Sequence, residues 1–106
     1  MKKTKNKLQD MKKGYLIVRI NIKNAELFQQ YPPLSTEAVK KFEGKYLVRG
    51  GEFDVVEGKW SAERTTVVEF ESLEKAKEFY SSLEYDNAKK VRQESADTDL
   101  ILIEGC

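Results

Sequence analysis

The stretch GYLIVRINI at residues 14–22 is rich in β-branched and aromatic side chains, which is typical of a β-strand. A helical stretch follows it, and KYLV at residues 45–48 is expected to form a second strand. The same order returns with TTVVEF at 65–70, a helix, and DLILI at 99–103. Ala25 and Phe28 in the first helix recur as Ala76 and Phe79 in the second. Strand–helix–strand twice predicts βαββαβ, one sheet with two helices on one face.

The predicted helices cover only one side of this sheet, so the other side needs a partner. The first strand carries apolar side chains of both parities, and the last strand is apolar at successive positions, so both of its faces should be buried. Bulky side chains on an uncovered face would expose a larger apolar patch than monomers usually tolerate. The sequence therefore predicts a homodimer packed sheet to sheet.

The most informative feature of the composition is that the 106 residues include no histidine. This excludes Ser-His and Cys-His nucleophile pairs and His-ligated zinc, iron or haem. Any chemistry must then depend on tyrosine, arginine, lysine or carboxylates. The sequence also has no metal-ligand cluster and no phosphate-binding glycine loop, so we expect neither a metal nor a cofactor.

The first 13 residues differ in charge from the rest of the chain. They hold six lysines and one aspartate, whereas the whole chain has a net charge of +1. We expect a basic disordered extension at 1–13 and a single folded domain at 14–106. Contact of the extension with nucleic acid or an anionic membrane is the alternative. The lone cysteine, Cys106, and the absence of a long apolar run predict a cytoplasmic protein with no membrane segment.

Several motifs point together to one family: YLVRGG at 46–51, EGKW at 57–60, FYSSLEY at 79–85 and DLILIEG at 99–105. They resemble the bacterial domain-of-unknown-function family thirteen-thirty, in the dimeric α+β barrel superfamily. The resemblance covers about residues 14–105 and implies a ferredoxin-like α+β fold, with a four-stranded antiparallel sheet and a homodimer whose two sheets form a barrel. Glu43 departs from the family, which often has glycine there.

The resemblance implies no established activity. Relatives in the superfamily include small monooxygenases, muconolactone isomerase-like proteins and haem-degrading enzymes, whose activities do not transfer by fold alone. The missing histidine excludes the haem-degrading pattern.

Three charged residues lie inside the predicted strands: Arg19, Arg49 and Glu69. With the strand order 4-1-3-2, usual for this fold, Glu69 would bridge both arginines across one sheet face. One interpretation is a structural ion network that fixes the register. The other is an anion-binding wall, because arginine forks match carboxylates and phosphates. The pair Gly50-Gly51 predicts a bulge that turns Arg49 toward a cavity.

Four aromatic residues, Tyr31, Trp60, Tyr80 and Tyr85, are candidates to line a cavity between helices and sheet, with core packing as the alternative. Pro32-Pro33 should interrupt the first helix next to Tyr31, and Ser35 should cap the helical piece that follows. Tyr31 and Tyr85 are the candidate proton donors. Arg92 is a further candidate for substrate binding, with a surface ion pair to Asp99 as the alternative.

These residues predict a cofactor-independent protein that binds a small organic acid, as an isomerase-like or oxygenase-like enzyme. A non-catalytic ligand-binding or sensing dimer is the alternative. RNA-recognition modules share the βαββαβ topology, but the predicted third strand has an acidic residue and no stacking motif. We therefore expect a homodimer and a small ligand as partners, and no nucleic acid or membrane.

Overall fold

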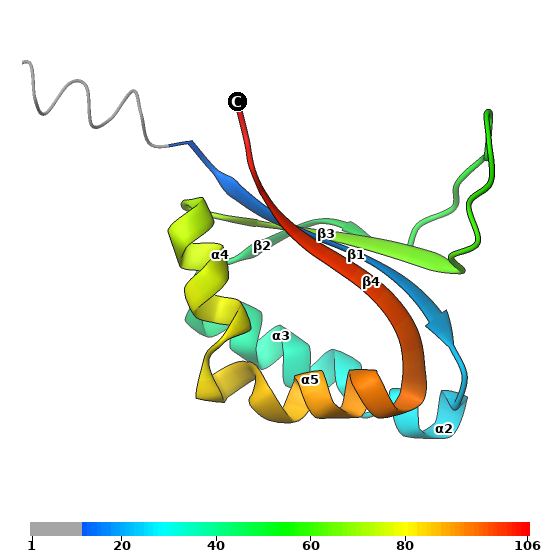
Figure 1. Ribbon diagram of the computed structural model, residues 1–106. Helices are drawn as coiled ribbons and strands as arrows, with labels where there is room; N and C mark the ends of the chain where they lie inside the picture. Colours follow the sequence, from blue (N-terminus) through cyan, green and yellow to red (C-terminus); the bar gives the residue numbers. More distant parts are fainter. Residues whose placement is uncertain (1–11) are drawn as a thin grey trace, which may run out of the picture.

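The computed structural model describes residues 12–106, and it contains one four-stranded antiparallel sheet with helices on one face (Figure 1). The elements in chain order are β1 (Gly14–Ile22), α2 (Ala25–Phe28), α3 (Tyr31–Lys41), β2 (Lys45–Arg49), β3 (Arg64–Phe70), α4 (Leu73–Tyr80), α5 (Leu83–Ser95) and β4 (Ala96–Glu104). The strand order is β2-β3-β1-β4. This confirms the predicted α+β, ferredoxin-like βαββαβ fold. The extension expected at residues 1–13 lies outside the described residues, apart from its last two.

Each strand–helix–strand half has its helix in two pieces, and the second piece begins with or close to a tyrosine. In the first half, α3 begins at Tyr31 with two prolines in its first turn, where a missing N–H costs nothing. The predicted cap at Ser35 is therefore wrong, because Ser35 lies inside α3. In the second half, the Ser82 hydroxyl accepts from the backbone N–H of Tyr85 at 3.1 Å and caps α5.

None of the helices within residues 12–106 has the length and apolarity that a membrane crossing requires.

The core lies between the helices and the inner face of the sheet. On β1, Leu16, Val18 and Ile20 are buried and alternate with half-buried residues. Inner-face side chains from β3 and β4 pack against them together with Phe79 and Tyr85 of the helices. This alternation gives the sheet one face covered by its own chain and one open face.

The open face carries exposed apolar side chains in the single chain. Ile101 is 52% exposed and Ile103 is 46% exposed, and they lie opposite Ile17 and Tyr15 of β1. No helix reaches this side, so the predicted burial of both faces of the last strand depends on a second copy of the chain.

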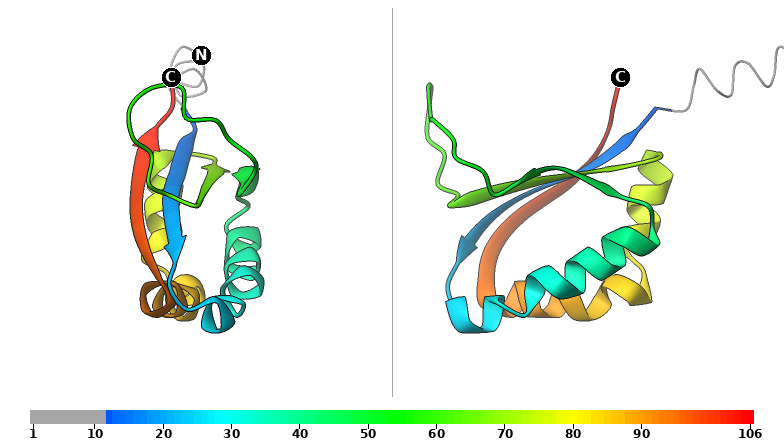
Figure 2. Two further views of the ribbon diagram at one scale, coloured as in Figure 1. Left: turned by 90° about the vertical axis from the view of Figure 1, so that its right-hand side faces the viewer. Right: turned by 180° about the vertical axis from the view of Figure 1, so that it is seen from behind.

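A long segment, residues 50–63, joins β2 to β3, and we call it the arm. It extends away from the helices on the open side of the sheet, as two views show (Figures 1 and 2). The arm begins at Gly50, whose φ of 66° suits glycine best. Its return to the sheet is fixed at Glu63, whose backbone N–H donates to Asn21 Oδ1 at 2.8 Å.

The expected bulge at the glycine pair lies instead within β2. Tyr46 is opposite Val68 and Val48 is opposite Val67, so one extra residue, Leu47, is accommodated between them. As a result, Tyr46 and Arg49 both point toward the inner face, although they are three positions apart.

Candidate functional site

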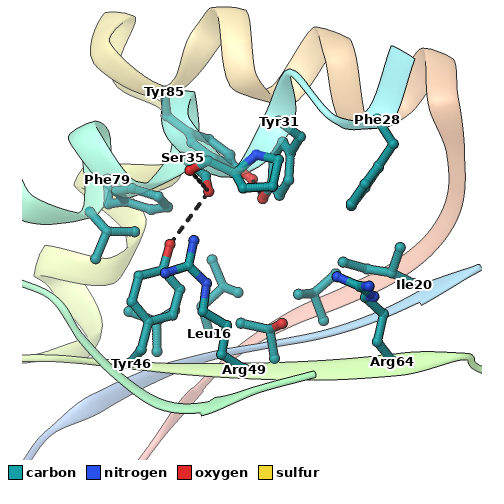
Figure 3. Close-up of a pocket in the computed structure, with 15 residues that line it drawn as sticks. Leu16, Ile20, Phe28, Tyr31, Ser35, Tyr46, Arg49, Arg64, Phe79 and Tyr85 are labelled. Carbon is teal, nitrogen blue, oxygen red and sulfur yellow. Dashed lines mark hydrogen bonds between the residues drawn. The ribbon is translucent and has the colours of Figure 1, made fainter. Parts of the chain in front are cut away.

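A small cavity lies between the inner face of the sheet and helices α2 and α3 (Figure 3). Its volume is about 50 Å³, enough for a few waters or a very small organic molecule. This is well below the roughly 300–1,000 Å³ of a drug-sized pocket. Its walls are mainly apolar, and its polar lining comes from Tyr31, Ser35, Tyr46, Arg49, Arg64, Thr66 and Tyr85. None of the lining residues is acidic.

Arg49 lies at the rim of this cavity and is held by two contacts. Its Nη2 donates to Thr36 Oγ1 at 2.7 Å. The guanidinium carbon lies 4.0 Å from the centre of the Tyr46 ring, a cation–π contact that the bulge in β2 makes possible. These contacts fix the guanidinium beside the cavity without neutralising its charge.

Arg64, at the start of β3, is the second cation of the rim. Its side chain rises from the sheet toward the helices near Ile20 and Phe28, at the other end of the cavity from Arg49 (Figure 3). Its guanidinium carbon lies 5.9 Å from the centre of the Phe28 ring. Within residues 12–106, neither rim arginine forms an ion pair. The rim is therefore positively charged and has no carboxylate of its own.

The helix side of the cavity ends in two tyrosines. The hydroxyl oxygens of Tyr31, on α3, and Tyr85, on α5, are 2.7 Å apart. Tyr85 is only 1% exposed. Burial, followed by the neighbouring Tyr85 hydroxyl, raises the pKa of Tyr31 far above its ordinary value. Tyr31 therefore keeps its proton at any physiological pH.

Arg92 lies behind this pair and is 2% exposed. Its Nε donates to the Tyr85 hydroxyl at 3.3 Å, and its Nη1 donates to Thr98 Oγ1 at 2.6 Å. No carboxylate of the described chain pairs with it. The alternative of a surface ion pair with Asp99 is wrong, because Arg92 points inward from α5 while Asp99 faces outward from β4.

A second hydroxyl pair links the helices to the sheet. Ser35 Oγ and the Tyr46 hydroxyl are 3.4 Å apart across the cavity (Figure 3). Ser35 Oγ also lies 3.3 Å from the Pro32 carbonyl oxygen, to which it donates. The cavity thus combines cations at the rim with hydroxyls on its walls.

The predicted triad of Arg19, Arg49 and Glu69 does not form. Arg19 pairs with Asp99 on the open face, at 3.2 Å. Glu69 lies opposite Tyr15, not opposite Arg19, and accepts from the Tyr15 hydroxyl at 3.1 Å. Arg49 lies opposite Thr66 on the inner face. The register therefore places two of the three charges on one side of the sheet and the third on the other.

Two of the four aromatic candidates lie away from the cavity. Trp60 belongs to the arm, and its ring centre is 4.8 Å from the Arg19 guanidinium carbon. Tyr80 packs behind Tyr85, with ring centroids 6.1 Å apart, and Lys89 Nζ lies 3.9 Å from the centre of its ring. Only Tyr31 and Tyr85 of the four line the cavity.

Arg64, Ser35 and Tyr46 line the cavity but were missed as site residues. Arg64 could have been found from the sequence, since it shares the parity of Thr66, Val68 and Phe70, which face inward from β3. Tyr46 could not, because simple alternation along β2 places it on the opposite face from Arg49.

Among the described residues, no three acidic or cysteine side chains gather in a way that would hold a metal ion.

Comparison with known protein families identifies the family of this chain. Residues 13–106 match the model of a family described as Domain of unknown function (DUF1330). The chain belongs to this family. The DUF1330 match spans both rim arginines, the tyrosine pair and Arg92, and it confirms the resemblance seen in the motifs. A search of the curated proteins finds no match.

Solved structures similar to this DUF1330 chain support the fold. One is a protein of unknown function from Rhodopseudomonas palustris, with 18% identity and a TM-score of 0.72, covering 100% of this chain and 94% of that chain. A dimeric protein of unknown function with a ferredoxin-like fold, from Bacteroides fragilis, has 15% identity and a TM-score of 0.54, covering 87% and 95%. SnoaB, a cofactor-independent oxygenase from Streptomyces nogalater, has 6% identity and a TM-score of 0.51, covering 87% and 91%. At these identities the likeness concerns the fold alone.

Proposed function

We propose that this protein binds a small organic acid in the cavity between helices and sheet, with Arg49 and Arg64 holding its carboxylate. The observation that carries the proposal is the pair of rim arginines with no acidic residue among the lining. Arginine forks match a carboxylate in geometry and charge, and an anion would neutralise the rim.

The position of the two arginines on the sheet supports this proposal. Arg49 lies directly opposite Thr66, and Arg64 is two residues before Thr66 on the same strand. The arginines are therefore diagonal neighbours on one sheet face, a spacing that long side chains can reach across. A bound anion would offset the positive charge that both side chains bring to the rim.

The cavity also holds the groups that a cofactor-independent enzyme would need. Tyr31 and Tyr85 present hydroxyls at the inner wall, and phenols serve as general acids when they are positioned against a substrate. SnoaB shows that a related fold hosts an oxygenase that needs no cofactor. We propose isomerase-like or oxygenase-like chemistry on the bound acid. A ligand-sensing dimer would use the same rim without turnover.

Butyrate binding to the wild type and to Arg49→Ala tests the anion site. A charged hydrogen bond contributes roughly 1.5–3 kcal/mol, so the variant should bind at least about tenfold more weakly by isothermal titration calorimetry. Lys40→Ala is the matched control, because it removes a positive charge from the exposed side of α3. Equal affinity in wild type and Arg49→Ala would show that the rim is not the anion site. Consumption of a bound acid over time would separate an enzyme from a sensor.

We also propose that a second copy of the chain covers the open face. That face carries exposed apolar side chains on β2 and β4, among them Val48 at 43% and Ile101 at 52% exposure. The arm adds exposed Phe53, Val55 and Val56 on the same side, and these residues line a hollow of about 400 Å³. The Bacteroides fragilis protein with this type of fold is dimeric, which supports a homodimer here. A sheet-to-sheet pair would bury both patches at once.

A further inference from the structure

We infer that Arg92, Tyr85 and Tyr31 form a one-way chain of hydrogen-bond donors that ends in the cavity, and that this chain makes the site selective for short oxo acids. The inference rests on the proposed function, since it concerns the inner end of the same cavity. The direction of each hydrogen bond in the chain predicts a second group on the ligand that the site would recognise.

The direction is set at the buried end of the chain. A guanidinium has five N–H donors and no acceptor, so the Tyr85 oxygen must accept from Arg92 Nε. Arg92 is buried, and its Nη1 donates to Thr98 Oγ1 at 2.6 Å, a second contact that orients the guanidinium.

The Tyr85 hydroxyl then has one possible hydrogen-bond acceptor among the described residues. Tyr85 has a single O–H, and its hydroxyl has two partners within residues 12–106, Arg92 and Tyr31. Arg92 cannot accept, so Tyr85 donates to the Tyr31 oxygen at 2.7 Å. Neither tyrosine is left with a buried unsatisfied oxygen.

The last proton, on Tyr31, is left for the cavity. The Tyr31 oxygen already accepts from Tyr85, and no protein acceptor for its own proton lies among the described residues. Tyr31 lines the cavity, facing the sheet from the helix side (Figure 3). The inner wall therefore presents a hydroxyl donor whose natural partner is an oxygen atom of the ligand.

Arg92 strengthens this donor from a distance. Each hydrogen bond in a chain polarises the next, and the effect is greatest where water is excluded. A buried cation at the far end draws electron density from Tyr85 and, through Tyr85, from Tyr31. The Tyr31 hydroxyl is thereby suited to an oxygen that carries partial or full negative charge, such as a carbonyl or an enolate.

The two ends of the cavity are therefore complementary to different chemical groups on one ligand molecule. The rim arginines bind a carboxylate, and the Tyr31 hydroxyl binds a second oxygen acceptor. The small volume limits the ligand to a few non-hydrogen atoms. A short chain acid with an oxo group fits both ends, whereas a simple fatty acid of the same length fits only the rim.

Calorimetric titration with butyrate, 2-oxobutyrate and 3-oxobutyrate tests this inference. The three acids share a carbon chain and a carboxylate, and they differ in the presence and position of the oxo group. Wild type should bind one of the oxo acids about three- to tenfold more tightly than butyrate, the gain expected from one hydrogen bond. Tyr31→Phe should remove that preference, so that the variant binds the oxo acids no more tightly than it binds butyrate.

A second variant tests the chain as distinct from Tyr31 alone. Tyr85→Phe leaves the Tyr31 hydroxyl in place but disconnects it from Arg92, so the preference for the oxo acid should fall without disappearing. Thermal melting checks that each variant is folded. If Tyr85→Phe kept the full wild-type preference for the oxo acid over butyrate, the proposed chain of hydrogen bonds would be overturned.

The outcomes also separate this inference from the proposed function. Equal affinity for all three acids in wild type, together with weaker binding of all three by Arg49→Ala, would overturn the oxo-acid inference and leave the anion site standing. Failure of all three acids to bind would overturn the anion site and the inference with it.

Discussion

Glu43 has a left-handed backbone conformation, which residues other than glycine rarely adopt. Its φ of 58° is the one positive φ found at a non-glycine residue within the described part of the chain. It follows the end of α3, where helices commonly end with glycine in the left-handed region. Glu43, where the resemblance of the motifs implies glycine, is thus a residue that carries strain.

Glu43→Gly should stabilise the protein. Relief of the left-handed strain, offset in part by the greater freedom of glycine in the unfolded chain, leaves a gain of about 0.5–1 kcal/mol. Urea unfolding measures it, and Lys40→Gly is the control, because glycine within α3 should cost about 1 kcal/mol. A lower midpoint for Glu43→Gly would contradict the assigned strain.

At this scale the sequence predicted the identity of several site residues better than their partners. Tyr31 and Tyr85 were two of the four aromatic residues predicted to line a cavity, and these two do line it. Their mutual hydrogen bond joins residues 54 positions apart and depends on how α3 and α5 pack. The Arg19–Glu69–Arg49 triad was wrong for the same reason, because strand register is set by the whole sheet.

The bulge in β2 is the element that shapes the rim. Without an extra residue, strict alternation along a strand would send Tyr46 and Arg49 to opposite faces. With Leu47 accommodated, both side chains face the cavity and stack on each other. The fold could be predicted from repeated strand–helix–strand patterns, but nothing in KYLVR marks this irregularity.

Changes in the length of β2 test the role of the bulge. Deletion of Leu47 should restore a regular ladder and keep Arg49 opposite Thr66, so butyrate affinity should stay within about threefold of wild type, roughly 0.6 kcal/mol. Insertion of one alanine between Val48 and Arg49 should turn the guanidinium to the open face and reduce affinity as much as Arg49→Ala does. Undiminished binding by the insertion variant would show that register does not place Arg49.

At the scale of the whole molecule, the two faces of the sheet have separate roles. The inner face holds the cavity, and the open face holds the apolar patch of β2, β4 and the arm. The sequence predicted an uncovered face from the helix count alone. It could not predict the position of the arm, because residues 50–63 have no regular hydrophobic period.

Ile101→Glu should dissociate the proposed homodimer, because a carboxylate would be buried between apolar sheets without a partner. Leu83→Glu is a matched control, since Leu83 is 89% exposed at the start of α5, on the helix side. Multi-angle light scattering should give a dimer for wild type and Leu83→Glu, and a monomer for Ile101→Glu. A monomeric wild type at micromolar concentration would rule out the assembly.

The contact between the arm and the open face has an optical consequence. Trp60 is the single tryptophan of the chain, and its ring lies against the Arg19 guanidinium, away from the cavity. If a second copy covers this region, dilution should expose the indole and shift its fluorescence emission to longer wavelength. Butyrate in the cavity should leave the emission unchanged. The native protein would then report its own assembly without a label, independently of what its cavity holds.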